Sequence, residues 1–329
     1  MIVNAPRLGS VSSDQLQVAF DRFQLGRIES VTPASTGMGG QNLFVRTATG
    51  EYVFRGNPLF PGQFAKERYV ATVLHDRTTL PFPHPYFYDP IPDVFGWDYA
   101  IMPRLRGHAL SDPEIRPSLT RADFVAITHR LSDTLATIHR VHMPHAGDYD
   151  PASDSIVALD GPMSGREAGI VRTLMVWARE KTGQIEDADD RWIDGVLARC
   201  ARAVDTPFQP VVVLHDYQVG NMLFDRRAGS WIVTGVFDLA EAYVGDGESD
   251  LARTVTGLLR GAEVELARTF VEGYVQRRPT RPGLLDRLTT YSLAFLVIEW
   301  GLDAHLQQTA LRTFVADRLS RLKPVVDSI

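Results

Sequence analysis

The stretch Leu214-His215-Asp216-Tyr217-Gln218-Val219-Gly220-Asn221 carries a carboxylate and an amide five residues apart, on what we expect to be a short loop. A second carboxylate, Asp238, follows the apolar run Trp231–Phe237, which has the composition of a strand. Phosphoryl transfer from a nucleotide needs two carboxylates and an amide of this kind. One Asp orients the acceptor hydroxyl or takes its proton, while an Asn and another Asp hold Mg²⁺ against the phosphates. The order of these residues therefore indicates phosphoryl transfer.

Two further pieces of sequence follow in the order found in a known family. They are Val236-Phe237-Asp238-Leu239 and Gly245-Asp246-Gly247-Glu248-Ser249-Asp250-Leu251-Ala252. Together with residues 214–221 they resemble the pattern of the aminoglycoside phosphotransferase family of small-molecule kinases. That pattern is H-G-D-x-x-x-x-N, then an apolar strand ending I-D-W or I-D-F, then G-D-x-x-x-D-L-A. The resemblance runs from about residue 27 to the last helices and covers most of the chain.

The resemblance implies an α+β, bilobal fold similar to that of protein kinases, and the patterning of the chain agrees. Strand-like segments with Gly-containing turns fill the first third, whereas helical periodicity dominates from Thr120 onward. We expect a nucleotide-binding N-terminal lobe with an antiparallel sheet over residues 1–103. A larger, mainly helical lobe over residues 104–329 would hold the catalytic loop, the metal ligands and the acceptor.

The expected elements are short strands followed by long helices. Strands are predicted near 27–33, 42–46, 51–55, 97–102, 211–214, 222–225 and 231–237. Helices are predicted near 13–25, 64–74, 120–141, 166–180, 188–204, 262–277, 286–306 and 309–321.

The family pattern implies roles for three polar residues. Asp216 matches the family Asp and is the candidate catalytic base, because a carboxylate near the acceptor hydroxyl can orient it and accept its proton. Asn221 and Asp238 are the candidate Mg²⁺ ligands, since this ion prefers hard oxygen ligands and keeps several waters. The alternative is that Asp216 caps a loop and that the other two are polar residues in turns.

The same pattern also shows a departure. The family His lies two residues before the Asp, whereas here Leu214 fills that position and His215 directly precedes Asp216. We interpret His215 as structural. Asp250 matches the family's D-L-A aspartate, for which the resemblance implies a role in bracing the catalytic loop. Asp246 is expected to be solvated, and Glu248 likewise.

Nucleotide contacts are expected from the first lobe. Arg55 stands where kinase-like folds carry a strand lysine that contacts phosphates, and a guanidinium can bind phosphate through two N–H groups. Glu67, on the following helix, is the expected ion-pair partner of Arg55; a solvated helix charge is the alternative. Met102 ends a predicted strand that leads into the lobe connection, and we expect it near the purine.

The glycine-rich stretch 35–41 is the candidate phosphate-covering loop. Gly37, Gly39 and Gly40 would let backbone N–H groups approach a phosphate closely. The stretch is neither G-x-G-x-x-G nor a Walker A loop, which would need Gly-Lys-Ser/Thr. An ordinary Gly-rich turn is the alternative, and its position upstream of Arg55 favours the phosphate loop.

Composition excludes several other classes of protein. The chain has 329 residues and a net charge of −6, which argues against a general nucleic-acid binder. No apolar run reaches the roughly 18 residues of a membrane span, and the first residues lack a secretory-signal pattern. A single cysteine, Cys200, allows no internal disulfide and fits a reducing cytoplasm; we interpret it as a buried bystander. The sequence does not indicate the oligomeric state.

The acceptor is the least determined part of the prediction. Glu241, Glu299 and Asp303 are acidic residues of the second lobe, and the last two would share one face of a continuous helix, which suits a polycation. An ordinary surface helix is the alternative. Residues 148–184 carry no recognised signature and are interpreted as a substrate-specific insertion.

We therefore predict an enzyme that uses ATP or GTP with Mg²⁺ to phosphorylate a hydroxyl of a small molecule. The acceptor would be an antibiotic, such as an aminoglycoside, or a metabolite, such as choline, a sugar or an amino-alcohol. Two other hypotheses stay open. A catalytically silent kinase-like binding module is suggested by the altered His and by Arg55. A metal-dependent hydrolase would use the same carboxylates, although no His-rich ligand set accompanies them.

Overall fold

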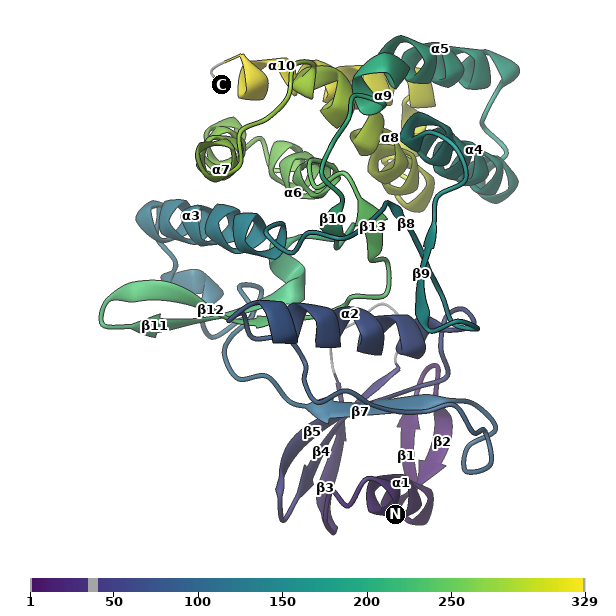
Figure 1. Cartoon of the computed structure of the whole chain (residues 1–329), viewed down its shortest axis with the longest axis vertical. Coiled ribbons are helices and arrows are strands. Elements are labelled where there is room, and N and C mark those ends of the chain that lie inside the picture. Colours follow the sequence, from purple (N-terminus) through teal and green to yellow (C-terminus); the bar gives the residue numbers. More distant parts are fainter. Residues whose placement is uncertain (1, 35–40, 328) are drawn as a thin grey trace.

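The computed structural model describes residues 2–34, 41–327 and 329, which form two lobes (Figure 1). A five-stranded antiparallel sheet with the order β3-β4-β5-β7-β6 forms the centre of the N-terminal lobe. Its strands are β3 (Ile28–Pro33), β4 (Asn42–Thr47), β5 (Gly50–Gly56), β6 (Phe87–Asp89) and β7 (Tyr99–Pro103). The pairing of Thr47 with Gly50 leaves a two-residue turn between β4 and β5.

A small N-terminal unit covers one face of this sheet. It consists of the hairpin β1 (Ile2–Ala5) and β2 (Gly9–Ser12), followed by α1 (Ser13–Arg22). Ser12 caps α1, because its side chain accepts a hydrogen bond from the Gln15 N–H while the Gln15 side chain accepts one from the Ser12 N–H. Leu16 and Phe20 of α1 are fully buried against Phe54 and other sheet residues, so this lobe has its own apolar core.

Helix α2 (Gln63–Arg77) lies between the two lobes (Figure 1). Its buried residues Phe64, Val70 and Leu74 belong to the same apolar cluster as Ile127 and Leu131 of the second lobe. The helix therefore joins the N-terminal sheet to the core of the helical lobe.

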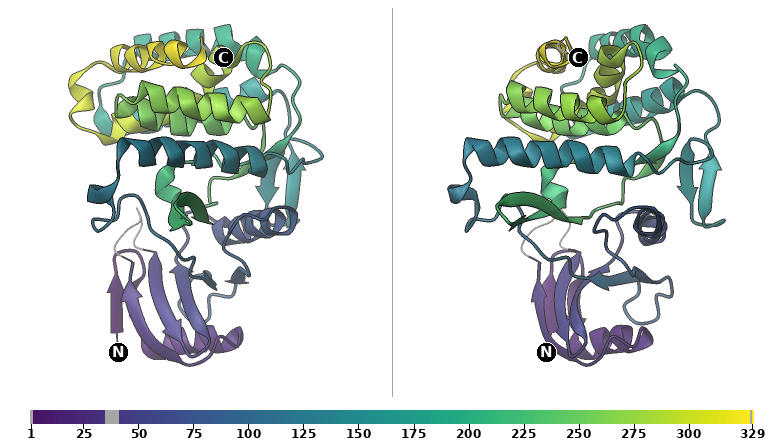
Figure 2. Two further views of the ribbon diagram at one scale, coloured as in Figure 1. Left: turned by 90° about the vertical axis from the view of Figure 1, so that its left-hand side faces the viewer. Right: turned by 60° about the vertical axis from the view of Figure 1, so that its left-hand side comes forward.

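The C-terminal lobe is built mainly of helices. They are α3 (Arg121–Ile138), α4 (Met163–Thr182), α5 (Asp187–Val204), α6 (Ser249–Arg260), α7 (Val264–Arg277), α8 (Leu284–Leu302), α9 (Leu311–Ser320) and α10 (Lys323–Val326), with single 3₁₀ turns at Arg116–Ser118, Val219–Asn221 and Leu306–Gln308. Helix α3 packs against α7 on one side and against strand β12 on the other (Figure 2). A second apolar cluster, centred on the fully buried Trp300, joins α4, α5, α8 and α9. Cys200 lies in this cluster, where burial raises the pKa of its thiol, as expected of a bystander.

Two small sheets carry the polar loops of this lobe. One has the order β10-β13-β8-β9, and the other is the hairpin β11-β12. Their strands are β8 (Gly147–Asp150), β9 (Ser155–Ala158), β10 (Val211–Val213), β11 (Met222–Arg227), β12 (Ser230–Val236) and β13 (Tyr243–Gly245). The loop 214–221 therefore runs from β10 into β11, and residue 238 lies two residues after the end of β12.

The segment 148–184 is an integral part of the lobe. Its first residues form the β8-β9 hairpin, which joins the sheet through the pairing of Gly147 with Val244, and its remainder contains the whole of α4. The hairpin also reaches α2: Arg68 donates to Asp154 at 2.8 Å, and the rings of Tyr69 and Tyr149 lie 5.3 Å apart. This region thus connects the lobes, and its interpretation as a substrate-specific insertion stays a prediction.

The predicted bilobal α+β fold is confirmed, and most predicted elements form within a few residues of their expected bounds. The main omission is α6, which begins inside the G-D-x-x-x-D-L-A piece. The predicted lobe boundary at residues 103 and 104 coincides with the end of β7. It stays a prediction, since nothing here separates the two lobes physically.

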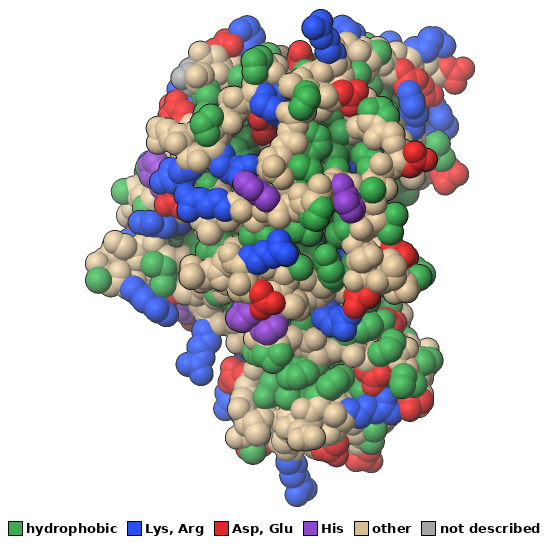
Figure 3. Space-filling model, viewed as in Figure 1, with side chains coloured by type: hydrophobic (Ala, Val, Ile, Leu, Met, Phe, Trp, Pro, Cys, Tyr) green, Lys and Arg blue, Asp and Glu red, His purple; other side chains and the backbone are tan. Residues whose placement is uncertain are grey.

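The surface shows no large area of one charge on the face drawn in Figure 3. Basic and acidic side chains are interspersed over both lobes there. Among the described residues, no helix is long and apolar enough to cross a membrane.

Candidate active site

The loop that carries Asp216 is held by Asp250, a side chain with no exposed surface in the first turn of α6. Its carboxylate accepts the backbone N–H of Leu214 at 2.8 Å and that of His215 at 2.7 Å. The ring of His139, at the end of α3, lies 3.0 Å away through Nε2. A buried carboxylate is stable only when its oxygens are hydrogen-bonded, so Asp250 fixes the start of the loop. This matches the bracing role that the sequence resemblance implies.

His139 is a member of this brace that the sequence did not indicate. It is fully buried, and its Nδ1 lies 2.9 Å from the hydroxyl of Tyr274. Gly247 packs on the ring so closely that a Cβ there would lie 2.7 Å from Nδ1, which explains why this position is glycine. A lone histidine at the end of an amphipathic helix has no spacing pattern that would reveal such a contact. Leu214, at the position of the family His, is buried and apolar.

Asp246 and Glu248 are buried, which corrects the expectation that they are solvated. Asp246 pairs with Arg281 and accepts the hydroxyl of Tyr291 at 2.8 Å. Glu248 accepts Nε of Arg287 at 2.6 Å. Sequence spacing cannot show these pairs because the arginines lie more than 30 residues away. They anchor the segment that leads into α6 and so set the position of Asp250.

His215 has an unusual environment for a histidine. Its backbone adopts φ +63°, which non-glycine residues rarely do, and its ring packs against Tyr243 and Phe295. Burial is the main cause that lowers the pKa of His215 to about 4, and the Arg166 cation adds to it. The ring is therefore neutral near pH 7 and acts as part of an apolar wall, as the structural interpretation predicted.

Asp216 and Asn221 are in direct contact. The Asn221 Nδ2 donates to the Asp216 backbone carbonyl at 2.9 Å and to its Oδ2 at 2.8 Å. Gln218 donates to both carboxylate oxygens at 2.9 Å, and the Arg253 Nε donates to Oδ1 at 2.6 Å. Since the Asn221 amide nitrogen is used here, its amide oxygen is turned away from Asp216 and has no hydrogen-bond partner among the described residues.

Asp238 lies beside this pair. The Phe237 N–H donates to the Asn221 carbonyl at 3.1 Å, so the end of β12 is tied to the catalytic loop. Asp238 has φ +63°, which non-glycine residues rarely adopt, and its carboxylate is half-exposed. One of its oxygens lies 3.9 Å from Nη2 of Arg55. The structure therefore brings the predicted base and both predicted metal ligands to one place.

Arg55 and Glu67 form the predicted ion pair between β5 and α2. Nη1 of Arg55 lies 2.5 Å from Oε2 of Glu67, which is only 1% exposed. Gln63 donates to the other oxygen at 2.9 Å, and Tyr86 donates to Oε2 at 3.0 Å. Burial raises the pKa of Glu67, and the Arg55 cation opposes this effect. Arg55 Nε is buried without a hydrogen-bond partner among the described residues, so this side chain retains a donor.

The remaining predicted nucleotide contacts are less defined. Gly37, Gly39 and Gly40 lie outside the described residues. The Met102 side chain is buried, and its backbone pairs with Val53 in the sheet, so this residue contributes its backbone position and little side-chain surface.

The acidic pair expected for a polycationic acceptor does not form. Helix α8 ends at Leu302, so Asp303 lies beyond it and is exposed, while Glu299 lies 3.8 Å from Arg260. Burial is the main cause that raises the pKa of Glu241; the Lys66 cation opposes it, and the charges of Asp238 and Asp216 add to it, which places Glu241 near the site.

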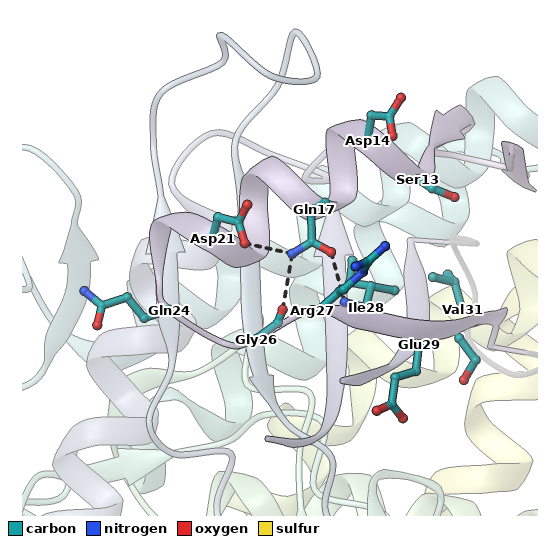
Figure 4. Close-up of a pocket in the computed structure, with 11 residues that line it drawn as sticks. Ser13, Asp14, Gln17, Asp21, Gln24, Gly26, Arg27, Ile28, Glu29 and Val31 are labelled. Carbon is teal, nitrogen blue, oxygen red and sulfur yellow. Dashed lines mark hydrogen bonds between the residues drawn. The ribbon is translucent and has the colours of Figure 1, made fainter. Parts of the chain in front are cut away.

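A large hollow lies elsewhere on the molecule. It has a volume of about 910 Å³ and opens between α1 and β3 in the N-terminal lobe. Figure 4 shows its lining, where Gln17 bonds to Asp21 and to the backbone of Gly26 and Ile28. None of the predicted site residues lines it, and Gln17 within it is already hydrogen-bonded to its neighbours. The chemistry of the residues around Asp216, and not the size of a hollow, therefore locates the site.

One group of possible metal ligands with imidazole nitrogens exists among the described residues. His75, Asp76 and His84 have ligand atoms within 4.8 Å of one another at the end of α2. The two rings are stacked, with centroids 3.9 Å apart, so their in-plane lone pairs run nearly parallel and do not converge on one ion. This group does not include the carboxylates near Asp216 and gives no support to a hydrolase.

Comparisons with known proteins agree with this geometry. Residues 30–285 match the profile of the family described as the phosphotransferase enzyme family, APH. A search of curated proteins found no match. Among solved structures, aminoglycoside phosphotransferase APH(4)-Ia is similar with a TM-score of 0.64 and 17% identity, over 96% of this chain and 99% of that one.

Two further solved structures are similar and contain nucleotides. A thermostable mutant of APH(4)-Ia, in a ternary complex with ADP and hygromycin B, has a TM-score of 0.64 and 17% identity, over 96% of this chain and 99% of that one. The GDP complex of aminoglycoside 2'-phosphotransferase-IIIa has a TM-score of 0.59 and 13% identity, over 96% and 100%. At these identities the likeness shows the fold.

The buried ion pair yields a stability prediction. Glu67→Leu should lower the free energy of unfolding by about 3 kcal/mol, because the Arg55 guanidinium would stay buried without its counter-charge. The measurement is urea unfolding monitored by circular dichroism. Glu51→Leu is the matched control, since Glu51 forms an exposed pair with Arg46 that is worth about 0.5 kcal/mol or less. Equal losses in both variants would contradict the assigned burial.

His215 yields a prediction about pH. Its pKa of about 4 in the folded protein lies below the ordinary value of 6.5, so only the unfolded chain binds a proton between these values. Stability should therefore fall as the pH drops from 7.5 to 5. The loss should be about 1 to 2 kcal/mol greater in the wild type than in His215→Gln. Urea unfolding at both pH values measures it, and identical pH dependence in both proteins would refute the buried neutral ring.

Proposed function

The chain belongs to the phosphotransferase enzyme family, and on this premise we propose that it transfers the γ-phosphate of ATP or GTP to a hydroxyl group of a small molecule. One observation carries the proposal. The Asn221 amide donates to the Asp216 carboxylate at 2.8 Å, the Phe237 N–H next to Asp238 donates to the Asn221 carbonyl at 3.1 Å, and the Asp238 carboxylate lies 3.9 Å from the Arg55 guanidinium. These are the groups that in-line phosphoryl transfer requires.

In the proposed reaction, Asp216 orients the acceptor. The acceptor oxygen attacks the γ-phosphorus, the bond from this phosphorus to the β–γ bridging oxygen breaks, and the nucleoside diphosphate leaves with that electron pair. The hydroxyl proton passes to Asp216 late in the step. Arg55, held by Glu67, contributes positive charge toward the phosphates, and its position is rigid because the pair is buried.

The donor atoms next to Asp216 fit a magnesium ion. The Asn221 amide oxygen has no protein partner among the described residues, and the half-exposed Asp238 carboxylate has only the 3.9 Å contact with Arg55. Hard oxygen ligands with room for water are what Mg²⁺ prefers. When bound, the ion would neutralise charge on the phosphates; Asn221 and Asp238 would hold it.

The acceptor is proposed only as a class. The solved relatives named above support a small-molecule acceptor, and hygromycin B stands among their ligands. Since Glu299 and Asp303 do not form an acidic pair here, a metabolite hydroxyl is as well supported as a polycationic antibiotic. A nucleoside-diphosphate release assay over a panel of antibiotics and hydroxyl-bearing metabolites would identify it. We further propose that the enzyme works in the cytoplasm.

The role of Asp216 yields a prediction. Asp216→Ala should lower acceptor-dependent turnover by about 10² to 10⁴-fold, since a positioned base contributes about that much. Nucleotide binding, followed by thermal stabilisation with Mg²⁺ and ATP or GTP, should persist because the side chain contacts the acceptor and not the nucleotide. Turnover near the wild-type level would remove the base assignment. Wild-type protein that binds nucleotide but turns over no acceptor of the panel would favour the silent binding module.

Asp238 yields a separate prediction about the metal. Asp238→Ala should shift the Mg²⁺ concentration for half-maximal nucleotide binding upward by about tenfold or more, because one of two protein ligands is lost. A titration of Mg²⁺ at fixed nucleotide, read by calorimetry, measures the shift. Asp225→Ala, at an exposed carboxylate of β11, is the control and should leave the titration unchanged. A titration curve that Asp238→Ala leaves in place would count against this ligand.

A further inference from the structure

The carboxylate of Asp216 has no free hydrogen-bonding site in this structure. Its Oδ1 accepts Arg253 Nε at 2.6 Å and Gln218 Nε2 at 2.9 Å, and its Oδ2 accepts Gln218 Nε2 at 2.9 Å and Asn221 Nδ2 at 2.8 Å. An ionised carboxylate offers about four lone-pair sites, so these four contacts fill it. A water molecule or an acceptor hydroxyl must therefore compete with these donors for Asp216, whose side chain is 28% exposed.

The three donors differ in how firmly they are held. Asn221 bonds twice to Asp216, and the Phe237 N–H holds its backbone. Gln218 spans both carboxylate oxygens from within the same loop. Arg253 reaches over from α6 and contributes one N–H. Arg253 is therefore the donor whose removal disturbs the loop least.

Arg253 is also placed to find another partner. Its two terminal nitrogens have no hydrogen-bond partner among the described residues, although they carry four of its five N–H groups. The guanidinium carbon lies 5.5 Å from the centre of the Phe295 ring, and the side chain is 21% exposed. An arginine in this position can release Asp216 and donate to oxygen atoms of a bound acceptor while it keeps its contact with the Phe295 ring.

We propose that Arg253 is a specificity residue that makes the enzyme select an acceptor hydroxyl over water. This inference rests on the proposed function. Without acceptor, Arg253 occupies Oδ1 and Asp216 cannot orient a water molecule toward the γ-phosphate. An acceptor displaces Arg253, because contacts with the rest of its surface offset the lost bond, whereas water makes no such contacts. The released guanidinium then binds oxygen atoms next to the reacting hydroxyl.

The reaction that Arg253 suppresses is hydrolysis of the bound nucleotide. In it, the oxygen of water attacks the γ-phosphorus, and the bond to the β–γ bridging oxygen breaks with its electron pair going to the diphosphate. One water proton passes to Asp216 and then to solvent, and the products are a nucleoside diphosphate and inorganic phosphate. The need for Asp216 is the same as in acceptor phosphorylation.

The test uses the full chain with Mg²⁺ and ATP, and separately GTP, in the absence of any acceptor. Arg253→Met keeps the length of the side chain and its contact with Phe295 but removes its donors. Phosphate release should rise by about tenfold, a fraction of the 10² to 10⁴ that a positioned base contributes. The rise should vanish in Asp216→Ala/Arg253→Met. Arg253→Lys, which keeps a charged donor, should stay within about threefold of wild type.

A matched control lies on the same helix. Arg260→Met alters an arginine two turns farther along α6 that contacts only Glu299, at 3.8 Å, and phosphate release should stay at the wild-type rate. Thermal melts establish that each variant is folded. Should Arg253→Met fail to fold, Gln218→Leu removes another donor from the Asp216 carboxylate and should also raise the rate of phosphate release. An unchanged or lower rate in the folded variant overturns the inference.

The design separates this inference from the proposed function. If Asp216→Ala keeps acceptor-dependent turnover near the wild-type level, the base assignment itself fails. If that turnover is lost and Arg253→Met releases phosphate no faster than the wild type without acceptor, only the selection by Arg253 fails.

Discussion

The position of the whole site depends on one buried anion, the carboxylate of Asp250. Two backbone N–H groups and an imidazole satisfy it, so the turn at His215 is held in a conformation that the chain would not adopt alone. The charge cannot relax toward water, because it has no exposed surface. Any shift of α6 would therefore move Asp216 or leave a buried carboxylate unpaired, which costs several kcal/mol.

Two further interactions fix the position of the N-terminal lobe relative to this loop. Glu67 orients Arg55 from α2, and the buried face of α2 belongs to the core of the helical lobe. The β8-β9 hairpin adds the contact between Arg68 and Asp154 on the outer side. The Arg55 side chain, which the sheet carries, is thus positioned by a helix whose buried face packs on the core of the C-terminal lobe. Movement between lobes would have to change these contacts first.

Sequence reasoning reached the parts of the site that lie close together in the chain. The spacing of Asp216, Asn221 and Asp238 follows from one loop and one strand, so a local pattern could indicate their meeting. The Arg55 and Glu67 pair was also accessible, because a strand and the next helix bring the two together.

The parts that sequence reasoning missed depend on distant contacts. His139 meets Asp250 across 111 residues, and Arg287 meets Glu248 across 39. Arg253 directly follows the G-D-x-x-x-D-L-A piece, but no pattern in the sequence indicates that α6 turns it toward Asp216. No periodicity encodes such pairings, because they arise only when helices pack. For the same reason, Asp303 was placed on a helix face that ends one residue before it.

As the proposed base, Asp216 has to meet two opposing demands, and the arrangement of its donors reconciles them. A base must be held rigidly, which favours many hydrogen bonds, yet it must keep a lone pair for the proton it accepts. Donors from its own loop supply the rigidity here, since Asn221 and Gln218 move only with that loop. Arg253, from α6, supplies the fourth hydrogen bond, so it can leave without loosening the other three. The reactive lone pair is then exposed only when something larger than water fills the space beside Phe295.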